Sequence, residues 1–253
     1  MKQPVAQVAS AVALWIGLAL APEVALAQAA PAPDVLSNET ITVDGVSANF
    51  VLRLPRTRGP RPLILALHFG GTPTAFYGRG LIANLIGPAF AELDAVIVAP
   101  TCFDGSWLRP RCEANALAVL DYALENYPVD PSRVLVSGFS MGGVGTWHFA
   151  SKFPERFMAG IPVASRPTAS EPLPTIPMWA LHSTDDEVFP IARTRDAIRP
   201  LLARDPRCVF EVISGVTHFE TARFAEPLTR SVDWVRGVVW EEEPDSEPLI
   251  EPL

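Results

Sequence analysis

Short apolar runs alternate with longer amphipathic stretches through most of this chain. A short continuous apolar run is typical of a strand that is buried on both faces, whereas a longer stretch with helical spacing predicts a helix. The predicted strands cover residues 63–68, 95–99, 134–138, 158–164, 178–182 and 208–213, and the predicted helices cover residues 81–93, 113–127, 141–153, 190–203 and 226–239. Because the two kinds alternate, the pattern predicts an α/β fold with a mostly parallel central sheet and helices on both faces.

Two further segments complete the predicted architecture. Residues 40–43 and 46–54 flank an Asp44-Gly45 turn, and their alternating apolar positions predict an N-terminal antiparallel hairpin. Residues 165–177 contain four prolines and are predicted to form a loop. Because this loop is too short to fold into a separate layer over the sheet, we expect no cap domain.

The ends of the chain differ from its body. Residues 1–27 combine a basic start, an apolar run and a small-residue cleavage site, which is typical of a signal peptide. The apolar run is short for a membrane span, so an uncleaved anchor is the weaker alternative and we expect no stable membrane anchor. A Pro/Ala-rich linker at 28–39 and a single domain at 40–240 follow, and a disordered acidic tail closes the chain at 241–253. These features predict an exported protein, periplasmic or extracellular.

Charge and cysteine content narrow the possible partners. The formal net charge is −8, and six acidic residues of the tail account for most of it, which argues against a nucleic-acid partner. The three cysteines form no Cys/His cluster, so we expect no metal. Cys102 and Cys112 bracket a short loop, and their spacing favours a disulfide over the alternative of free thiols.

The segment from Val134 to Gly145 carries the first candidate for chemistry. An apolar strand stops at Gly138, and a helix begins after Ser140, so the sequence reads as a strand, a tight elbow and a helix around a Gly-x-Ser-x-Gly motif. Such an elbow needs small residues at Gly138 and Gly142, because the flanking chains pass close to each other. Ser140 is therefore the candidate nucleophile.

A serine nucleophile needs a base, and the base needs an orienting acid. In proteins with this elbow the acid follows the serine and the histidine comes last. His68 is excluded because it precedes Ser140, and His148 because it lies within the elbow helix. His182 closes a strand and precedes the nearby acids. We expect His68 and His182 to be structural, each holding a loop through a backbone hydrogen bond. His218, in the loop after the last predicted strand, is the candidate base.

The acid is expected in the loop after the strand that ends at His182. Asp186 is the first choice and Asp185 the second. The alternative is that these carboxylates form an exposed acidic turn and that His218 is a surface histidine. The order of nucleophile, acid and base argues against that alternative.

Several motifs together resemble the α/β-hydrolase superfamily, in particular secreted esterases of the feruloyl-esterase, polyhydroxybutyrate-depolymerase and phospholipase/carboxylesterase type, including predicted peptidases. The matching segments are residues 67–71, 129–134, 138–147, 153–157 and 182–190. The resemblance aligns the family's catalytic acid with Asp186. It also implies an oxyanion hole made by the backbone N–H groups of Met141 and Gly70, with Phe69, which replaces a usual glycine, as an alternative donor or a pocket residue.

The resemblance implies an enzyme without a cofactor that hydrolyses carboxylic esters. An exported, uncapped site predicts an ester substrate that can be bulky or polymeric, and Phe69, Trp107, Phe189 and Phe219 are candidate pocket residues. A serine peptidase and a non-catalytic binding protein of the same fold are the alternatives. The sequence makes no prediction of the oligomeric state.

Overall fold

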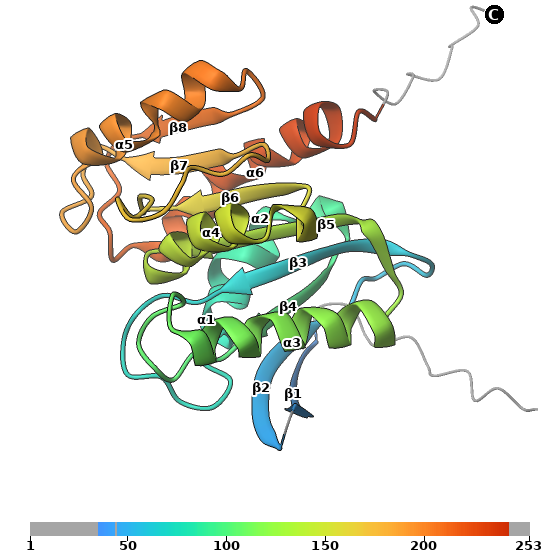
Figure 1. Ribbon diagram of the computed structural model, residues 1–253. Coiled ribbons are helices and arrows are strands. Elements are labelled where there is room, and N and C mark those ends of the chain that lie inside the picture. Colours follow the sequence, from blue (N-terminus) through green and yellow to red (C-terminus); the bar gives the residue numbers. More distant parts are fainter. Residues whose placement is uncertain (1–34, 44, 243–253) are drawn as a thin grey trace, which may run out of the picture.

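In the computed structural model, residues 35–43 and 45–242 can be described, and they form one open sheet with helices on both faces (Figure 1). The predicted signal peptide at 1–27 and nearly all of the predicted tail lie outside these residues. Within the described ranges the sheet has eight strands in the order β1-β2-β4-β3-β5-β6-β7-β8. The strands are β1 (Leu36–Val43), β2 (Val46–Arg53), β3 (Arg61–Leu67), β4 (Val96–Pro100), β5 (Val129–Phe139), β6 (Ala159–Val163), β7 (Trp179–Ser183) and β8 (Val209–Ile213).

The pairing of the strands confirms the predicted fold class. β1 and β2 form the antiparallel hairpin, β2 pairs antiparallel with β4, and the remaining neighbours pair in parallel. The hairpin begins earlier than predicted, because β1 pairs from Leu36, opposite Arg53, so residues 36–39 belong to the sheet and not to the linker. Near the start of β5, the backbone N–H of Ser132 donates to Oδ1 of Asp130 at 2.9 Å, and the register with β3 shifts between Arg61 and Leu63.

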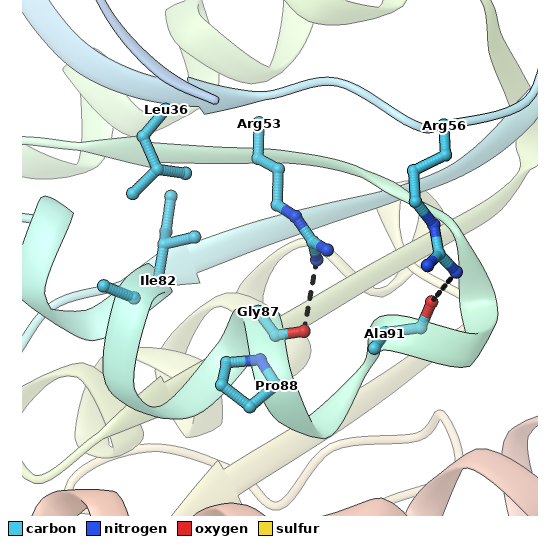
Figure 2. Close-up of a pocket in the computed structure, with 8 residues that line it drawn as sticks. Leu36, Arg53, Arg56, Ile82, Gly87, Pro88 and Ala91 are labelled. Atoms are coloured by element: carbon cyan, nitrogen blue, oxygen red, sulfur yellow. Dashed lines mark hydrogen bonds between the residues drawn. The ribbon is translucent and has the colours of Figure 1, made fainter. Parts of the chain in front are cut away.

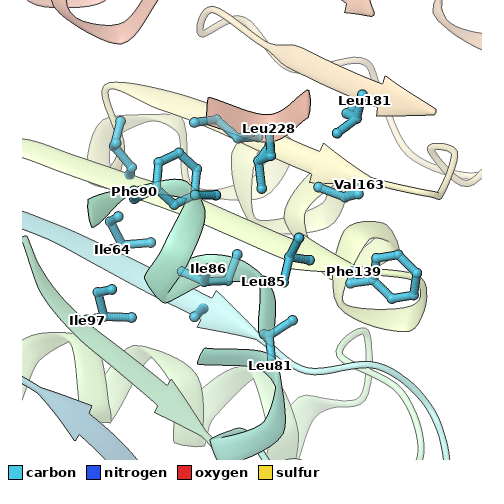
Figure 3. Close-up of a cluster of buried hydrophobic side chains, with 14 of the residues drawn as sticks. Ile64, Leu81, Leu85, Ile86, Phe90, Ile97, Phe139, Val163, Leu181 and Leu228 are labelled. Carbon is cyan, nitrogen blue, oxygen red and sulfur yellow. The ribbon is translucent and has the colours of Figure 1, made fainter. Parts of the chain in front are cut away.

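Alternate residues of the strands point to opposite faces and create two hydrophobic clusters. In β3, Ile64 and Ala66 belong to one cluster and Leu63, Leu65 and Leu67 to the other. The second cluster is covered by α3 (Pro110–Asn126), α4 (Met141–Lys152) and α5 (Ile191–Arg204). The first cluster, shown in Figure 3, is covered by the helical segments at 79–93 and 221–239. Both faces of the parallel strands are therefore buried, as their continuous apolar runs predict.

The two helical segments on the first face are less regular than their sequence spacing suggests. Residues 79–93 divide into α1 (Arg79–Leu81), the π-helix η1 (Ile82–Ile86), α2 (Gly87–Ala89) and the 3₁₀-helix η2 (Ala91–Leu93). Pro88 lies inside this segment and cannot donate a backbone hydrogen bond, which accounts for part of the irregularity. The C-terminal segment divides into η4 (Thr221–Phe224), α6 (Ala225–Trp234) and the π-helix η5 (Val235–Val239).

Other predicted elements keep their places, with small changes at their ends. α3 begins at Pro110, three residues before the predicted start, because proline is well suited to the first helical position. A short 3₁₀-helix, η3 (Pro154–Arg156), follows α4, and residues 165–177 form turns and bends, as predicted. Within the described ranges, no helix combines the length and the apolar character that crossing a membrane requires.

Candidate active site

The elbow between β5 and α4 holds Ser140 in a strained backbone conformation. Ser140 has φ 57° and ψ −116°, a region that residues with a side chain rarely adopt. A Cβ atom on Gly142 would lie 1.8 Å from the carbonyl oxygen of Leu67, and one on Gly138 would lie 2.5 Å from the backbone of Gly142. The two glycines therefore allow β5, the start of α4 and the end of β3 to approach each other closely.

Two loops at the carboxyl ends of neighbouring strands bring a base and an acid to this serine. His218, after β8, lies with Nε2 2.8 Å from the hydroxyl oxygen of Ser140. Its Nδ1 lies 2.9 Å from Oδ2 of Asp186, which follows β7. His218 and Asp186 are both buried, at 4% and 5% exposure. The three residues that the sequence singles out thus form one continuous chain of hydrogen bonds.

The surroundings of Asp186 favour its ionised form. Its Oδ1 accepts hydrogen bonds from the backbone N–H groups of Val188, at 2.9 Å, and Phe189, at 2.7 Å. Burial raises the pKa of this carboxyl, but the hydrogen bonds from His218 and Phe189 outweigh it, so that the pKa lies below its ordinary value. Asp186 is therefore a carboxylate that can orient the imidazole of His218 and stabilise its protonated form.

Asp185, the second choice for the acid, is exposed, and Asp186 is the residue that binds the imidazole. Its Oδ2 accepts a hydrogen bond from the backbone N–H of Gly215, at 2.7 Å. Glu187 follows Asp186 in the sequence, and its Oε2 accepts a hydrogen bond from the backbone N–H of His218, at 2.9 Å. Sequence reasoning assigned no role to Glu187, because a contact with a backbone N–H across two loops leaves no mark in residue spacing.

His68 and His182 hold loops in place, as predicted from the sequence. Nδ1 of His68 lies 2.8 Å from the carbonyl oxygen of Phe69, and its Nε2 accepts a hydrogen bond from the backbone N–H of Cys102 at 3.0 Å. His182 binds the carbonyl oxygen of Phe189 through Nε2, at 2.7 Å. Burial lowers the pKa of His68 to about 4, so this imidazole is neutral at pH 7.

His148 has a different environment from that of the other histidines. It is buried on α4 between two carboxylates, with Nε2 2.6 Å from Glu113 of α3 and Nδ1 in contact with Glu171 of the 165–177 loop. Lys152 also binds Glu113, at 2.7 Å. This polar cluster ties the elbow helix to α3 and to the loop that follows β6.

The groups predicted for an oxyanion hole lie next to each other beside Ser140. Met141 occupies the first position of α4, where a backbone N–H has no acceptor within the helix. Gly70 is exposed, and a Cβ atom built on it would lie 3.8 Å from the Cβ atom of Met141. Two N–H groups at the start of a helix and in an adjacent loop suit a developing negative charge.

A cavity of about 500 Å³ opens between the loop that follows β3 and the loop that carries His218. Two candidate pocket residues, Phe69 and Phe219, line it together with Asn84, Glu220 and Arg223 and with smaller residues. Phe219 is 78% exposed, and its ring centroid lies 5.6 Å from that of His218. The ring of Phe189 also lies near the imidazole, with its centroid 5.7 Å away. The cavity therefore has aromatic and polar walls next to the loop that carries His218.

Trp107 is not a pocket residue, which corrects the prediction made from the sequence. Its side chain is completely buried, and its indole N–H donates to the carbonyl oxygen of His68 at 2.9 Å. A Cβ atom built on Gly145 would lie 2.7 Å from the Cβ atom of Trp107. A disulfide, predicted from the sequence, joins Cys102 at the start of the loop that contains Trp107 to Cys112 in the first turn of α3, and Cys208 is a buried free thiol. Trp107 therefore supports the loop after β3 from within the core.

A second cavity, of about 370 Å³, lies between the hairpin and the helical segment at 79–93 (Figure 2). Arg53 donates to the carbonyl oxygen of Gly87 at 3.1 Å, and Arg56 donates to that of Ala91 at 3.4 Å. Among the residues that the structure describes, no group of histidine, cysteine and acidic side chains converges as a metal site requires.

Comparisons with known proteins agree with this architecture. Residues 94–232 match the Dienelactone hydrolase family. Acetylxylan esterase A of Emericella nidulans is 30% identical over 153 residues, which are 54% of this chain and 49% of that protein. A putative esterase of Nocardia uniformis subsp. tsuyamanensis, NocK, is 31% identical over 163 residues, which are 58% of this chain and 46% of that protein. This chain therefore spans about half the length of these curated relatives.

The solved structure of a thermostable esterase superposes on this chain with a TM-score of 0.63 and 22% sequence identity, covering 79% of this chain and 62% of that one. At this level of identity the likeness shows the fold. Together with the family match and the esterase relatives, it confirms the resemblance to α/β-hydrolase esterases seen in the sequence.

Proposed function

Because this chain belongs to the dienelactone hydrolase family, we propose that it is a serine esterase that cleaves carboxylic esters through Ser140, His218 and Asp186. The observation that carries this proposal is the continuous chain of hydrogen bonds from the serine through the imidazole to the carboxylate, at 2.8 and 2.9 Å. The strained backbone of Ser140 supports it, because such strain is typical of a nucleophile elbow.

The proposed reaction proceeds through an acyl-enzyme. The oxygen of Ser140 attacks the ester carbonyl carbon while Nε2 of His218 takes the hydroxyl proton, and Asp186 stabilises the resulting imidazolium. The N–H groups of Met141 and Gly70 bind the oxyanion. The bond to the leaving alcohol breaks as His218 passes its proton to the alcohol oxygen. Water then attacks the acyl-enzyme by the same steps and regenerates Ser140.

The substrate that we propose is an ester on a bulky or polymeric alcohol, such as an acylated polysaccharide. One relative is named an acetylxylan esterase, and residues 165–177 leave the site without a cap. The cavity between Phe69 and Phe219 combines aromatic faces with the polar side chains of Asn84, Glu220 and Arg223, which suits a hydroxyl-rich ring.

We also propose that the protein is exported. The signal-like sequence of residues 1–27 supports this proposal, and a disulfide between Cys102 and Cys112 fits an oxidising compartment. Sequencing of the N-terminus of protein recovered from the periplasm or the medium should find a start near Gln28. Recovery of the intact N-terminus from the cytoplasm alone would contradict export.

The test of the proposed activity is covalent labelling with a fluorophosphonate, combined with turnover of p-nitrophenyl esters of increasing acyl length and of a matched p-nitroanilide. We expect the wild-type protein to be labelled and to hydrolyse esters, and we expect Ser140→Ala to lose labelling and at least about 10³-fold in kcat, because the nucleophile is absent.

Ser37→Ala is the matched control, because Ser37 lies on the edge strand β1, away from the elbow. It should keep both properties. Anilide turnover that exceeds ester turnover would assign a peptidase instead. A folded wild-type protein that neither labels nor hydrolyses any ester or anilide would favour a binding protein.

A further inference from the structure

The loop that carries His218 is held by carboxylates. Residues 214–220 precede the helical segment at 221–239 and follow β8. The backbone N–H groups of Gly215, Thr217 and His218 donate to the carboxylates of Asp185, Glu220 and Glu187, at 2.7, 2.8 and 2.9 Å. Because a loop has no regular partners for its N–H groups, acceptors on side chains determine where such a backbone lies.

Asp186 and Glu187 are consecutive residues, and they bind His218 at two different points. Asp186 accepts from the imidazole Nδ1, and Glu187 accepts from the main-chain N–H of the same residue. The turn that presents both carboxylates is itself closed by the hydrogen bonds from Val188 and Phe189 to Asp186. One turn therefore fixes both the backbone and the side chain of His218.

From this two-point attachment we infer that Glu187 is a positioning residue for the proposed reaction: its carboxylate fixes the backbone of His218 so that the imidazole meets Ser140 and Asp186 together. This inference rests on the proposed function. Glu187 itself is exposed, and its carboxylate accepts a hydrogen bond from the main-chain N–H of His218. In the role inferred here it exchanges no proton with the substrate. Asp185 holds the loop three residues earlier, at Gly215, and therefore controls the path of the loop and not the histidine itself.

The geometry predicts a loss of rate without a loss of binding. The imidazole must stay within hydrogen-bond reach of two partners at once, and small misplacements of a catalytic group are costly. We expect Glu187→Ala to lower kcat about 10-fold while KM stays within about twofold. Glu187→Gln keeps an oxygen that can accept the same hydrogen bond, so its kcat should stay within about threefold of the wild-type value.

The experiment measures kcat and KM for a short p-nitrophenyl ester, with active sites counted by fluorophosphonate titration. Counting active sites separates a slower enzyme from a smaller folded fraction. Glu226→Ala is the control, because Glu226 is 80% exposed on its side chain and pairs only loosely with Arg230, at 3.7 Å, so it should match the wild type. Wild-type kcat in Glu187→Ala, or equal losses in the Ala and Gln variants, would overturn the inference.

A spectroscopic measurement keeps the test independent of turnover. The proton on Nδ1 of His218 is hydrogen-bonded to Asp186 and gives a downfield NMR resonance when the bond persists. We expect this resonance in the wild type and in Glu187→Gln, and we expect it to broaden or vanish in Glu187→Ala. If the wild type shows no labelling and no turnover, the proposed function fails, and an unchanged resonance in Glu187→Ala would then separately overturn the positioning role.

Discussion

At the scale of single residues, the elbow depends on two glycines, because a Cβ atom at either position would collide with the backbone. Gly138 and Gly142 have no Cβ, and the strand that ends at Leu67 passes through the space that a Cβ on Gly142 would occupy. Ser140, which lies between them, has a strained backbone conformation with a positive φ of 57°. The motif could be found in the sequence because this steric demand limits the residue types that fit.

Gly142→Ala should therefore destabilise the protein and abolish activity. A Cβ atom 1.8 Å from the carbonyl oxygen of Leu67 forces the backbone apart, and overpacking of this kind costs about 1–3 kcal/mol or more. Urea unfolding and fluorophosphonate labelling measure the two effects. Gly237→Ala is the matched control, because a Cβ there meets nothing within 4 Å and should be neutral or stabilising. A stable, labelled Gly142→Ala protein would contradict the steric account.

At the scale of elements, the alternation of apolar runs predicted the strands and most helices, because strands buried on both faces and amphipathic helices leave clear patterns. The pattern did not reveal the π-helical turns at 82–86 and 235–239, since one extra residue per turn barely changes hydrophobic spacing. Nor could it show that Trp107 points inward, because loop conformation decides that direction.

The order of Ser140, Asp186 and His218 along the chain was enough to nominate them, because parallel strands bring their carboxyl ends to one edge. The sequence could not predict the different roles of the neighbouring carboxylates. Asp185, Asp186 and Glu187 are chemically alike in the sequence, and only the turn between β7 and α5 decides which of them faces the imidazole and which faces a backbone N–H.

The disulfide connects the end of β4 to the first turn of α3, and its removal should loosen this junction. The bridge joins cysteines ten residues apart, and the chain-entropy model gives about 3 kcal/mol for a loop of this length. We expect the Cys102→Ser/Cys112→Ser variant to unfold at a lower urea concentration than the wild type. Its free energy of unfolding should be smaller by about 3 kcal/mol. Reductant should lower the stability of the wild type but leave the double variant unchanged. Equal stability of both proteins would contradict a stabilising bridge.

At the scale of the whole molecule, buried neutral histidines make folding sensitive to acid. The pKa of His68 is about 4 in the folded protein and about 6.5 when unfolded, so the unfolded chain takes up the proton first as the pH falls. The stability is therefore complete above pH 6.5 and declines between pH 6.5 and 4, by about 3 kcal/mol from His68 alone. Burial also lowers the pKa of His182, which acts in the same direction.

The check is urea unfolding at a series of pH values for the wild type and for His68→Gln, which cannot be protonated. The variant should be less stable at pH 7, because its hydrogen bonds to Phe69 and Cys102 are altered, but its stability should fall less steeply below pH 6.5. Parallel curves for the two proteins would show that His68 does not carry the acid sensitivity.

The arginines at the second cavity connect the hairpin to the helical segment at 79–93. Arg53 ends the hairpin strand β2, and Arg56 follows it; both bind carbonyl groups of the helical segment at 79–93. The same segment contributes Gly80 and Asn84 to the wall of the cavity beside His218. Substitutions in the hairpin can therefore change the shape of that wall from a distance. Directed evolution can use them to alter substrate selectivity while Ser140, His218 and Asp186 keep their positions.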